Sequence, residues 1–344
     1  MAYALPDYRQ AAPYAVQVEP TEGCNLRCVF CGLNGIRGKN VRETDKYMTV
    51  ETATALAESM RKHKWNSRIE FSMHGEPTLN PNLVDIVHVI RMNLPRASIM
   101  LTTNGVPLQK QGLEGQIRAL FSAGLNFIAL DNYAGLTVAR DMRVVCAEND
   151  IPCFEYPSNP EGNPHRRHDP RYAGVAIVQD IGAATSGTHA TLNNHAGAGA
   201  PLNNKAAGKR CAKPFREMSI RWDGSVAICC NSWRGDYVIG NINERSVHSV
   251  WHDPRFYAAR KYLLQGRREF KPCLGCDALS YRPGLLPDPK GLYSQSYPKP
   301  DDADDAVIAE ALADGPLTPP VLRPWEKPLN VIQPGLFDQE EQDA

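Results

Sequence analysis

Three cysteines, Cys24, Cys28 and Cys31, fall within eight residues in the run Cys-Asn-Leu-Arg-Cys-Val-Phe-Cys. The run follows residues 15–21, which are predicted to form a strand that leads into a loop. Three thiolates on one tight loop can hold three irons of a 4Fe–4S cube and leave the fourth iron open to a chelating ligand. Structural zinc sites take four ligands and usually come from paired Cys-x2-Cys units, so zinc is the disfavoured alternative.

A second set of cysteines lies later in the chain. Cys211 and Cys229 are separated by 17 residues, and Cys273 and Cys276 form a Cys-x2-Cys pair. The turn residues Asp223–Gly224 predict a hairpin that brings Cys229 back toward Cys211. Four thiolates can complete the ligand shell of a 4Fe–4S cluster or of a zinc ion, and the spacing alone does not choose between them.

Around the first set, the sequence resembles the radical S-adenosylmethionine superfamily. That family has this cysteine spacing and an aromatic residue just before the third cysteine, here Phe30. The resemblance implies that Cys24, Cys28 and Cys31 hold a 4Fe–4S cluster whose open iron is chelated by S-adenosylmethionine. An electron from a donor such as flavodoxin or ferredoxin then cleaves the cofactor into methionine and a 5′-deoxyadenosyl radical, which abstracts a hydrogen atom. The cofactor carries this chemistry, and the protein positions it and excludes water.

A second motif supports the resemblance. His74-Gly75-Glu76-Pro77 resembles the family's Gly-Gly-Glu-Pro motif, which binds the amino group of the methionine moiety, although histidine replaces the first glycine. A glycine lets the backbone approach a ligand closely, and the carboxylate of Glu76 suits an ammonium group.

Polar residues also end the later strands. Thr103 and Asn104 close the third predicted strand, where the family often contacts the ribose, although an ordinary Asn-Gly turn explains them nearly as well. Asp131 and Gln179 end later predicted strands at the same carboxyl end of the barrel, the barrel mouth, where the active sites of such folds lie. They are weaker candidates for site residues.

The second cysteine set resembles the SPASM and twitch modules of the same superfamily. Ile239–Asn241 and a helix start near Trp251 match recurrent features of those modules. A full SPASM module has seven cysteines, so the resemblance implies the shorter twitch form with one auxiliary 4Fe–4S cluster, and zinc remains the alternative.

Three cysteines stand outside both sets: Cys146, Cys153 and Cys230. Buried free cysteine behaves as a small hydrophobic residue, so core packing is the default expectation for each. Cys230 adjoins Cys229, and a thiol near the substrate could return a hydrogen atom to a product radical. It is therefore the candidate catalytic residue.

The elements that position these residues alternate between strand and helix. Apolar periodicity, caps and turns predict about six β/α units, which implies an α/β fold built as a partial (β/α)6 barrel. The predicted strands cover residues 15–21, 68–73, 97–103, 125–131, 152–156 and 174–181. The predicted helices cover residues 50–64 with Thr49 as N-cap, a helix opened by Asn80 and Pro81, 113–123, 137–148 and 246–265.

Composition divides the chain into four parts. Residues 1–181 are predicted to form the barrel, and residues 182–209, rich in Gly, Ala and Asn, a linker or loop. Residues 210–280 are predicted to form a small cysteine-rich α+β module. Residues 281–344 hold 11 of the 27 prolines and an acidic run, which predicts an irregular tail.

The charge is balanced, with 38 basic and 38 acidic residues, so no global field indicates a nucleic-acid or membrane partner. No stretch approaches the roughly 18 apolar residues of a membrane span, and the N-terminus lacks a signal core. These features predict a cytoplasmic protein. In a reducing compartment its ten cysteines favour metal binding over disulfides.

Three functional classes compete. The first is a radical enzyme that isomerises or dehydrogenates a small molecule or modified nucleotide. In its compact build it is similar to viral enzymes that rearrange amino-acid-modified thymidine in DNA hypermodification, whose substrate is borne on DNA. The second is a peptide-modifying enzyme that forms thioethers, cross-links or epimers, which is disfavoured because only 23 residues precede Cys24. The third is a non-catalytic iron–sulfur or zinc binding protein.

Two basic clusters bear on the substrate. Arg166, Arg167 and Arg171 form one, and residues 205–216 contain the other. Arginine-rich loops suit phosphate binding, but a solvated face paired with the acidic tail is an equally good explanation.

Overall fold

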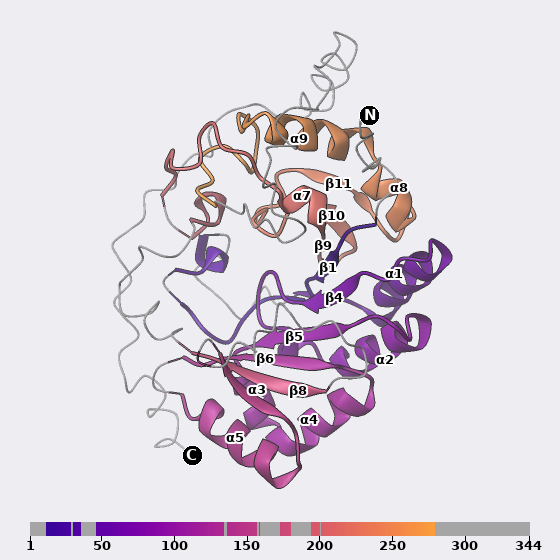
Figure 1. Ribbon diagram of the computed structural model, residues 1–344, viewed down its shortest axis with the longest axis vertical. Helices are drawn as coiled ribbons and strands as arrows, with labels where there is room; N and C mark the ends of the chain where they lie inside the picture. The colour runs from indigo at the N-terminus through magenta and orange to yellow at the C-terminus, as the bar shows by residue number, and fades with distance from the viewer. Residues whose placement is uncertain are drawn as a thin grey trace, which may run out of the picture.

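The computed structural model describes residues 12–28, 30–35, 46–133, 136–156, 158, 173–179, 194–199 and 201–278. The predicted tail and the basic residues Arg166, Arg167 and Arg171 lie outside these ranges. One nine-stranded sheet runs through the described chain in the order β11-β10-β9-β1-β4-β5-β6-β8-β7 (Figure 1). In the described part of the chain, no helix is long and apolar enough to cross a membrane.

Six parallel strands form the barrel part of the sheet. Five of the six are largely buried. The strands at residues 127–131 and 174–178 are almost wholly apolar, whereas the strand at residues 68–71 also buries Arg68 and Glu70. The fold class predicted from the sequence is thereby confirmed. The strands are β1 (Ala15–Val18), β4 (Arg68–Phe71), β5 (Ile99–Thr103), β6 (Phe127–Asp131), β8 (Gly174–Val178) and β7 (Cys153–Tyr156).

The last two barrel strands do not follow chain order. β8 pairs with both β6 and β7, so β7 becomes the edge of the sheet. β8 is an apolar Gly-Val-Ala-Ile-Val strand that can be buried on both faces, whereas β7 carries Glu155 and Tyr156 and is half-exposed. The more apolar strand takes the central position, because an edge tolerates polar side chains.

Helices pack along the outer side of these strands (Figure 1). Thr49 caps the first of them as predicted, because its hydroxyl accepts a hydrogen bond from the Thr52 amide at 3.2 Å. A short helix, α3, directly follows β5 and was not predicted. The helices are α1 (Val50–Lys62), α2 (Leu83–Asn93), α3 (Val106–Lys110), α4 (Leu113–Ser122) and α5 (Val138–Glu148).

The module after residue 210 continues the same sheet. Strand β9 (Glu217–Ile220) runs parallel to β1, and β10 (Ser225–Ala227) and β11 (Val238–Asn241) follow antiparallel to their neighbours. The predicted hairpin is confirmed, with Gly224 at a φ of 82° in the turn. Because buried residues of barrel and module belong to one core cluster, the module is packed against the barrel.

The single helix predicted over residues 246–265 is wrong. The chain instead forms α8 (Val247–Trp251) and α9 (Pro254–Leu264), preceded by the short α7 (Lys213–Arg216). The first helix ends at the C-cap His252, Asp253 caps the second, and Pro254 lies in the first turn of the second helix. Proline at the first turn of a helix is favourable but in a helix interior it removes a hydrogen bond, which explains the break.

Asn80 and Pro81 do not open the second helix as predicted, since its N-cap is Asn82. The Asn80 side chain instead accepts from the Asn82 amide at 2.9 Å and donates to the carbonyls of Pro20 at 2.8 Å and Met48 at 3.0 Å. These bonds tie the turn η3 (Pro77–Leu79) to the chain leaving β1 and to the start of α1.

We predict that Asn80→Ala lowers the free energy of unfolding by about 2 kcal/mol, because the Met48 carbonyl loses its side-chain donor, the Pro20 carbonyl keeps only the Met48 amide at 2.8 Å, and the Asn82 amide loses its acceptor. Asn93→Ala is the control: its side chain donates to the Val89 carbonyl within α2 at 3.0 Å and accepts from Arg61 in an exposed hydrogen bond at 3.2 Å. Urea denaturation of both variants checks this, and equal losses of stability would contradict the assigned role of Asn80.

Candidate functional site

The first cysteine set lies at the carboxyl ends of the barrel strands. Its loop joins β2 (Thr21–Glu22), which pairs with β3 (Lys46–Tyr47), to the turn η1 (Gly32–Gly35). Cys28 is buried, and Cys24 and Cys31 are partly exposed. The three sulfurs predicted to be iron ligands therefore lie on one short loop, as the spacing required.

Hydrogen-bond donors already face these sulfurs. The Cys24 sulfur accepts from the Leu26 amide at 3.3 Å and from the Asn104 side chain at 3.7 Å. Burial and the negative charge of Glu76 raise the pKa of the Cys24 thiol, and burial together with Cys31 raises that of Cys28 to about 12. These thiols therefore stay protonated at neutral pH unless a bound metal displaces their protons.

The Glu76 carboxylate is buried at the centre of this mouth. Its Oε1 accepts from the amide and hydroxyl of Thr78 at 3.0 and 2.6 Å and from the Thr103 hydroxyl at 2.6 Å. Oε2 accepts from the Asn104 amide at 2.8 Å. A carboxylate has about four acceptor positions. Oε2, with one donor, therefore has room for another. Burial raises the pKa of Glu76, and these donors oppose that rise.

Gly75 has no possible replacement at its position. Its φ is 80°, and a Cβ atom there would lie 2.3 Å from the carbonyl oxygens of Thr21 and Gly23. The next amide, of Glu76, donates to the Gly23 carbonyl at 2.6 Å. The turn is thus fastened directly to the cysteine loop, and Pro77 then starts the turn η3.

His74, which departs from the family motif, joins the barrel to the module. Its ring is fully buried, with Nδ1 2.7 Å from Glu19 Oε1 and Nε2 2.7 Å from the Cys230 carbonyl oxygen. Glu19 also accepts from the amide of Trp222 at 3.3 Å and from Arg221 at 3.4 Å. The histidine therefore cross-links the end of β1 to the loop that carries Cys229.

Asp131 and Gln179 both lie at the predicted mouth. Burial and the charge of Glu76 raise the pKa of the Asp131 carboxyl to about 7. Gln179 accepts from Asn132 at 2.8 Å and donates to Glu155. Phe30 lies in the turn before Cys31 and is partly exposed.

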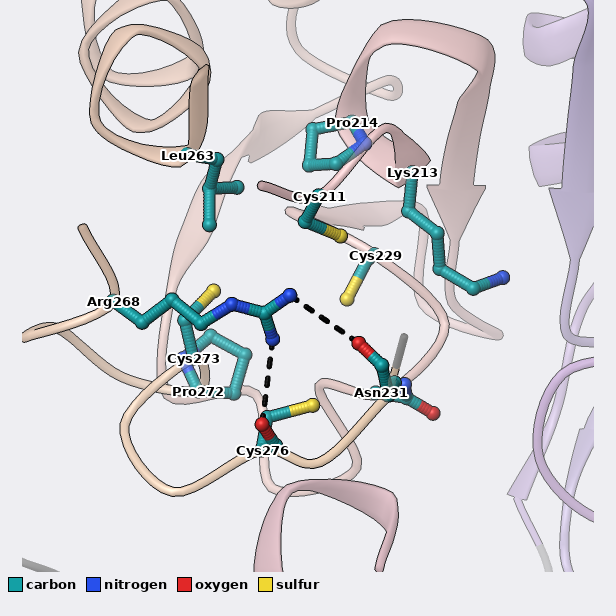
Figure 2. Close-up of a pocket in the computed structure, with 11 residues that line it drawn as sticks. Cys211, Lys213, Pro214, Cys229, Asn231, Leu263, Arg268, Pro272, Cys273 and Cys276 are labelled. Carbon is teal, nitrogen blue, oxygen red and sulfur yellow. Dashed lines mark hydrogen bonds between the residues drawn. The ribbon is translucent and has the colours of Figure 1, made fainter. Parts of the chain in front are cut away.

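The second cysteine set lines an open pocket (Figure 2). Its volume is about 320 Å³, which includes the solvent-filled space at its entrance. Cys211 comes from the segment before α7, Cys229 from the end of β10, and Cys273 and Cys276 from the loop after α9. Burial and the neighbouring thiolates raise the pKa values of Cys229 and Cys273 well above the ordinary range. The four thiols thus meet in one pocket, as the hairpin prediction required.

Two cations line this pocket, and the guanidinium of Arg268 points toward the thiols (Figure 2). Arg268 is 7% exposed and donates to main-chain carbonyls, two of which are those of Cys276 and Ala278 (Figure 2). Lys213 also lines the pocket, and its ammonium lies 2.9 Å from Glu217. Positive charge beside a set of thiolates offsets their mutual repulsion, so the pocket suits an anionic metal–thiolate group.

The thiols line a pocket and do not converge on one point. Throughout the described ranges, no three His, Cys, Asp or Glu side chains are placed to hold a single metal ion. An iron–sulfur cube keeps its four thiolates farther apart than a single zinc ion does. Four thiols around one cavity therefore suit a metal–thiolate group, and their positions alone do not choose between a cluster and zinc.

The three cysteines outside both sets were expected to pack in the core, and the structure places them differently from one another. Cys146 is buried in the core, but Cys153 is exposed on the edge strand, so core packing is wrong for it. Cys230 is partly buried, and its thiol is hydrogen bonded to Lys213 while its carbonyl faces His74.

Part of the predicted linker is bonded to the module. The amide of Asn194 donates to Asp277 at 2.6 Å, and the side chain of Asn203 donates to the same carboxylate at 2.9 Å. In the second basic cluster, the carbonyls of Lys209 and Arg210 accept from Arg268, and Lys213 pairs with Glu217. The side chains of Lys205, Lys209 and Arg210 are exposed, so phosphate binding by this cluster stays a prediction.

Sequence reasoning missed Glu19, Arg268 and Trp233. Each is a single residue outside any recognisable motif, and only its place next to a cysteine loop gives it importance. The position of Trp233, four residues after Cys229, was the one available signal.

Comparison with protein families agrees with this geometry. Residues 18–134 match the Radical SAM superfamily model, and residues 211–277 match SPASM, an iron–sulfur cluster-binding domain. The second match favours an iron–sulfur cluster in the four-thiol pocket, because the domain it identifies is an iron–sulfur cluster-binding one.

Individual relatives match over different extents. The S-adenosyl-L-methionine-dependent 2-deoxy-scyllo-inosamine dehydrogenase of Niallia circulans is 24% identical over 266 residues, which are 77% of this chain and 93% of that protein. A GTP 3′,8-cyclase of Chlorobaculum tepidum is 30% identical over 115 residues, but these are only 33% of this chain and 31% of the cyclase.

Solved structures share the fold. BtrN in complex with AdoMet and 2-DOIA has a TM-score of 0.58 and 23% identity, covering 78% of this chain and 95% of that one. BtrN in an open conformation has a TM-score of 0.53. The chain is therefore a member of the radical S-adenosylmethionine superfamily that carries a SPASM-type auxiliary module, and its cofactors are S-adenosylmethionine and 4Fe–4S clusters.

Proposed function

We propose that this enzyme dehydrogenates a small polar molecule, such as an amino sugar, aminocyclitol or modified nucleotide. The observation that carries the proposal is the similarity to a dehydrogenase over 93% of that relative's length, across both the barrel and the module. When bound, S-adenosylmethionine and the clusters supply the 5′-deoxyadenosyl radical and an acceptor for one electron. The substrate would lose one hydrogen atom to the radical, one proton to a base and one electron to the acceptor, and the two atoms that bore the hydrogens would then share a new double bond.

Different residues of the chain would bind the two clusters and S-adenosylmethionine. Cys24, Cys28 and Cys31 would hold the cluster that binds S-adenosylmethionine. The four thiols of the second pocket would hold the auxiliary cluster, with Arg268 as a nearby cation that favours electron acceptance. Glu76 would accept the ammonium of S-adenosylmethionine on Oε2, the oxygen that receives a single hydrogen bond from the protein.

The proton requires a base at the mouth. Asp131 ends β6 beside Glu76, and its carboxyl pKa of about 7 places it between its two protonation states near neutral pH. We assign to it the role of accepting the substrate's proton. Cys230 is less suited to hydrogen return, because dehydrogenation needs no returned hydrogen and its thiol is bonded to Lys213.

Isomerisation of the same substrate class is the second candidate, and product mass separates the two. Reconstituted enzyme is incubated anaerobically with aminocyclitol, amino-sugar and nucleotide candidates, and 5′-deoxyadenosine and product are measured by mass spectrometry. A product two hydrogens lighter, formed with one equivalent of 5′-deoxyadenosine, supports dehydrogenation. An unchanged mass indicates an isomerase.

Substitution of Glu76 tests its assigned role. We predict that Glu76→Gln weakens S-adenosylmethionine binding by roughly ten- to a hundredfold, because a charge-assisted hydrogen bond contributes about 1.5–3 kcal/mol. Calorimetric titration of the cluster-loaded protein measures this. Thr103→Val is the control, since it removes one donor to the carboxylate but keeps its charge, and a smaller loss is expected. Unchanged affinity in Glu76→Gln would move the ammonium site elsewhere.

Iron content tests the two ligand sets. We predict roughly eight irons per chain after reconstitution, because each set holds one 4Fe–4S cluster. Cys24→Ala should leave about four irons and abolish cleavage of S-adenosylmethionine, whereas Cys211→Ala should also leave about four but retain cleavage and lose product formation.

Cys153→Ser provides the matched control, because this exposed thiol belongs to neither set. It should keep the full iron content and full turnover. Four irons with one zinc in the unsubstituted protein would show that the second pocket takes zinc.

A further inference from the structure

Trp233 belongs to the module but packs on the first cysteine loop. It follows Cys229 by four residues and is 6% exposed. Its ring forms a small apolar cluster with Leu33 and Ala198, against which Cys24 and Cys31 pack. A residue supplied by the auxiliary module therefore lies beside the loop that holds the other metal site.

The indole reaches the backbone immediately after Cys31. A Cβ atom on Gly32 would lie 2.5 Å from Cε2 and 2.8 Å from Nε1 of Trp233. Such distances are far shorter than any real carbon contact, so only glycine admits the ring at this place. The pyrrole ring of the indole, which carries Nε1, thus packs with its face on the backbone of the cysteine loop.

The orientation of this ring is fixed by two imidazoles. His74 packs on it with ring centroids 4.1 Å apart, and His195 meets it edge-on at 5.2 Å. His74 is in turn held between Glu19 and the Cys230 carbonyl. The indole cannot turn its nitrogen elsewhere without breaking these contacts.

The indole N–H has no acceptor within the part of the chain that the structure covers, although Nε1 is buried. Burying a donor without an acceptor is costly, and nearly all buried donors in native proteins are satisfied. The apolar cluster that contains this ring packs against Cys24 and Cys31, whose sulfurs would carry negative charge once iron is bound.

We propose that Trp233 donates its indole N–H to a sulfur of the cluster held by Cys24, Cys28 and Cys31, either a thiolate or a bridging sulfide. This inference rests on the ligand set proposed above. Hydrogen bonds to cluster sulfurs stabilise the reduced form, in which the sulfurs are more negative, and so raise the reduction potential. The module would thereby tune the metal site of the barrel through one positioning residue.

Isotopic labelling tests the contact in the unsubstituted enzyme. The chain contains five tryptophans, and the reconstituted full chain is labelled with indole-15N tryptophan. We expect a 15N coupling in pulsed EPR of the reduced cluster, identified as the one whose signal changes when S-adenosylmethionine is added. The coupling should be absent in Trp233→Phe. No 15N coupling in the unsubstituted enzyme, or one that persists in Trp233→Phe, would overturn the proposal.

Redox titration tests the consequence. We expect the midpoint potential of that cluster to shift to a more negative value in Trp233→Phe while the iron content stays the same. Trp65→Phe is the matched control, because Trp65 is also 6% exposed but packs on Trp251, with ring centroids 6.4 Å apart. An unchanged potential in Trp233→Phe overturns the tuning role. Loss of the cluster in Cys24→Ala tests the ligand set separately.

Discussion

The pairing of β1 with a strand on each side is the constraint on which the site depends. Val18 is in register with Phe71 of β4 and with Ile220 of β9, so three strands end at the same level. The residues that follow them are Glu19, His74 and Trp222, and these are joined by hydrogen bonds. Because β9 comes from the module, one sheet register places both cysteine sets relative to each other.

Both metal sites bury charged groups, which is unfavourable, and each site offsets that cost in a different way. At the barrel mouth the acidic Glu76 is surrounded by four donors, which offset the loss of water around its carboxylate. In the module, Arg268 brings a positive charge to the four thiols and is itself held by backbone carbonyls. Both arrangements hold a charged side chain rigidly, as preorganised sites require.

Sequence patterns predicted much of this architecture because the relevant signals are local. The strands, the cap at Thr49 and the Gly224 hairpin follow from apolar periodicity and turn chemistry within a few residues. The break between α8 and α9 also has a local signal, because Asp253 is a capping residue that precedes Pro254. The apolar periodicity across the break nevertheless indicated one helix. The role of Asn80 could not be predicted from local sequence, since its side-chain amide donates hydrogen bonds to carbonyls that are 60 and 32 residues away in the chain.

The sequence by itself determined the chemistry: seven cysteines at metal-binding spacings, the Gly75–Glu76 turn and an α/β fold. Only the tertiary structure decided which strand lies at the edge, that the module extends the barrel sheet, and that His74 and Trp233 connect the two cysteine loops. The physical reason is range. Ligand spacing and turn geometry act over a few bonds, whereas strand order and side-chain packing depend on which distant apolar surfaces bury one another most completely.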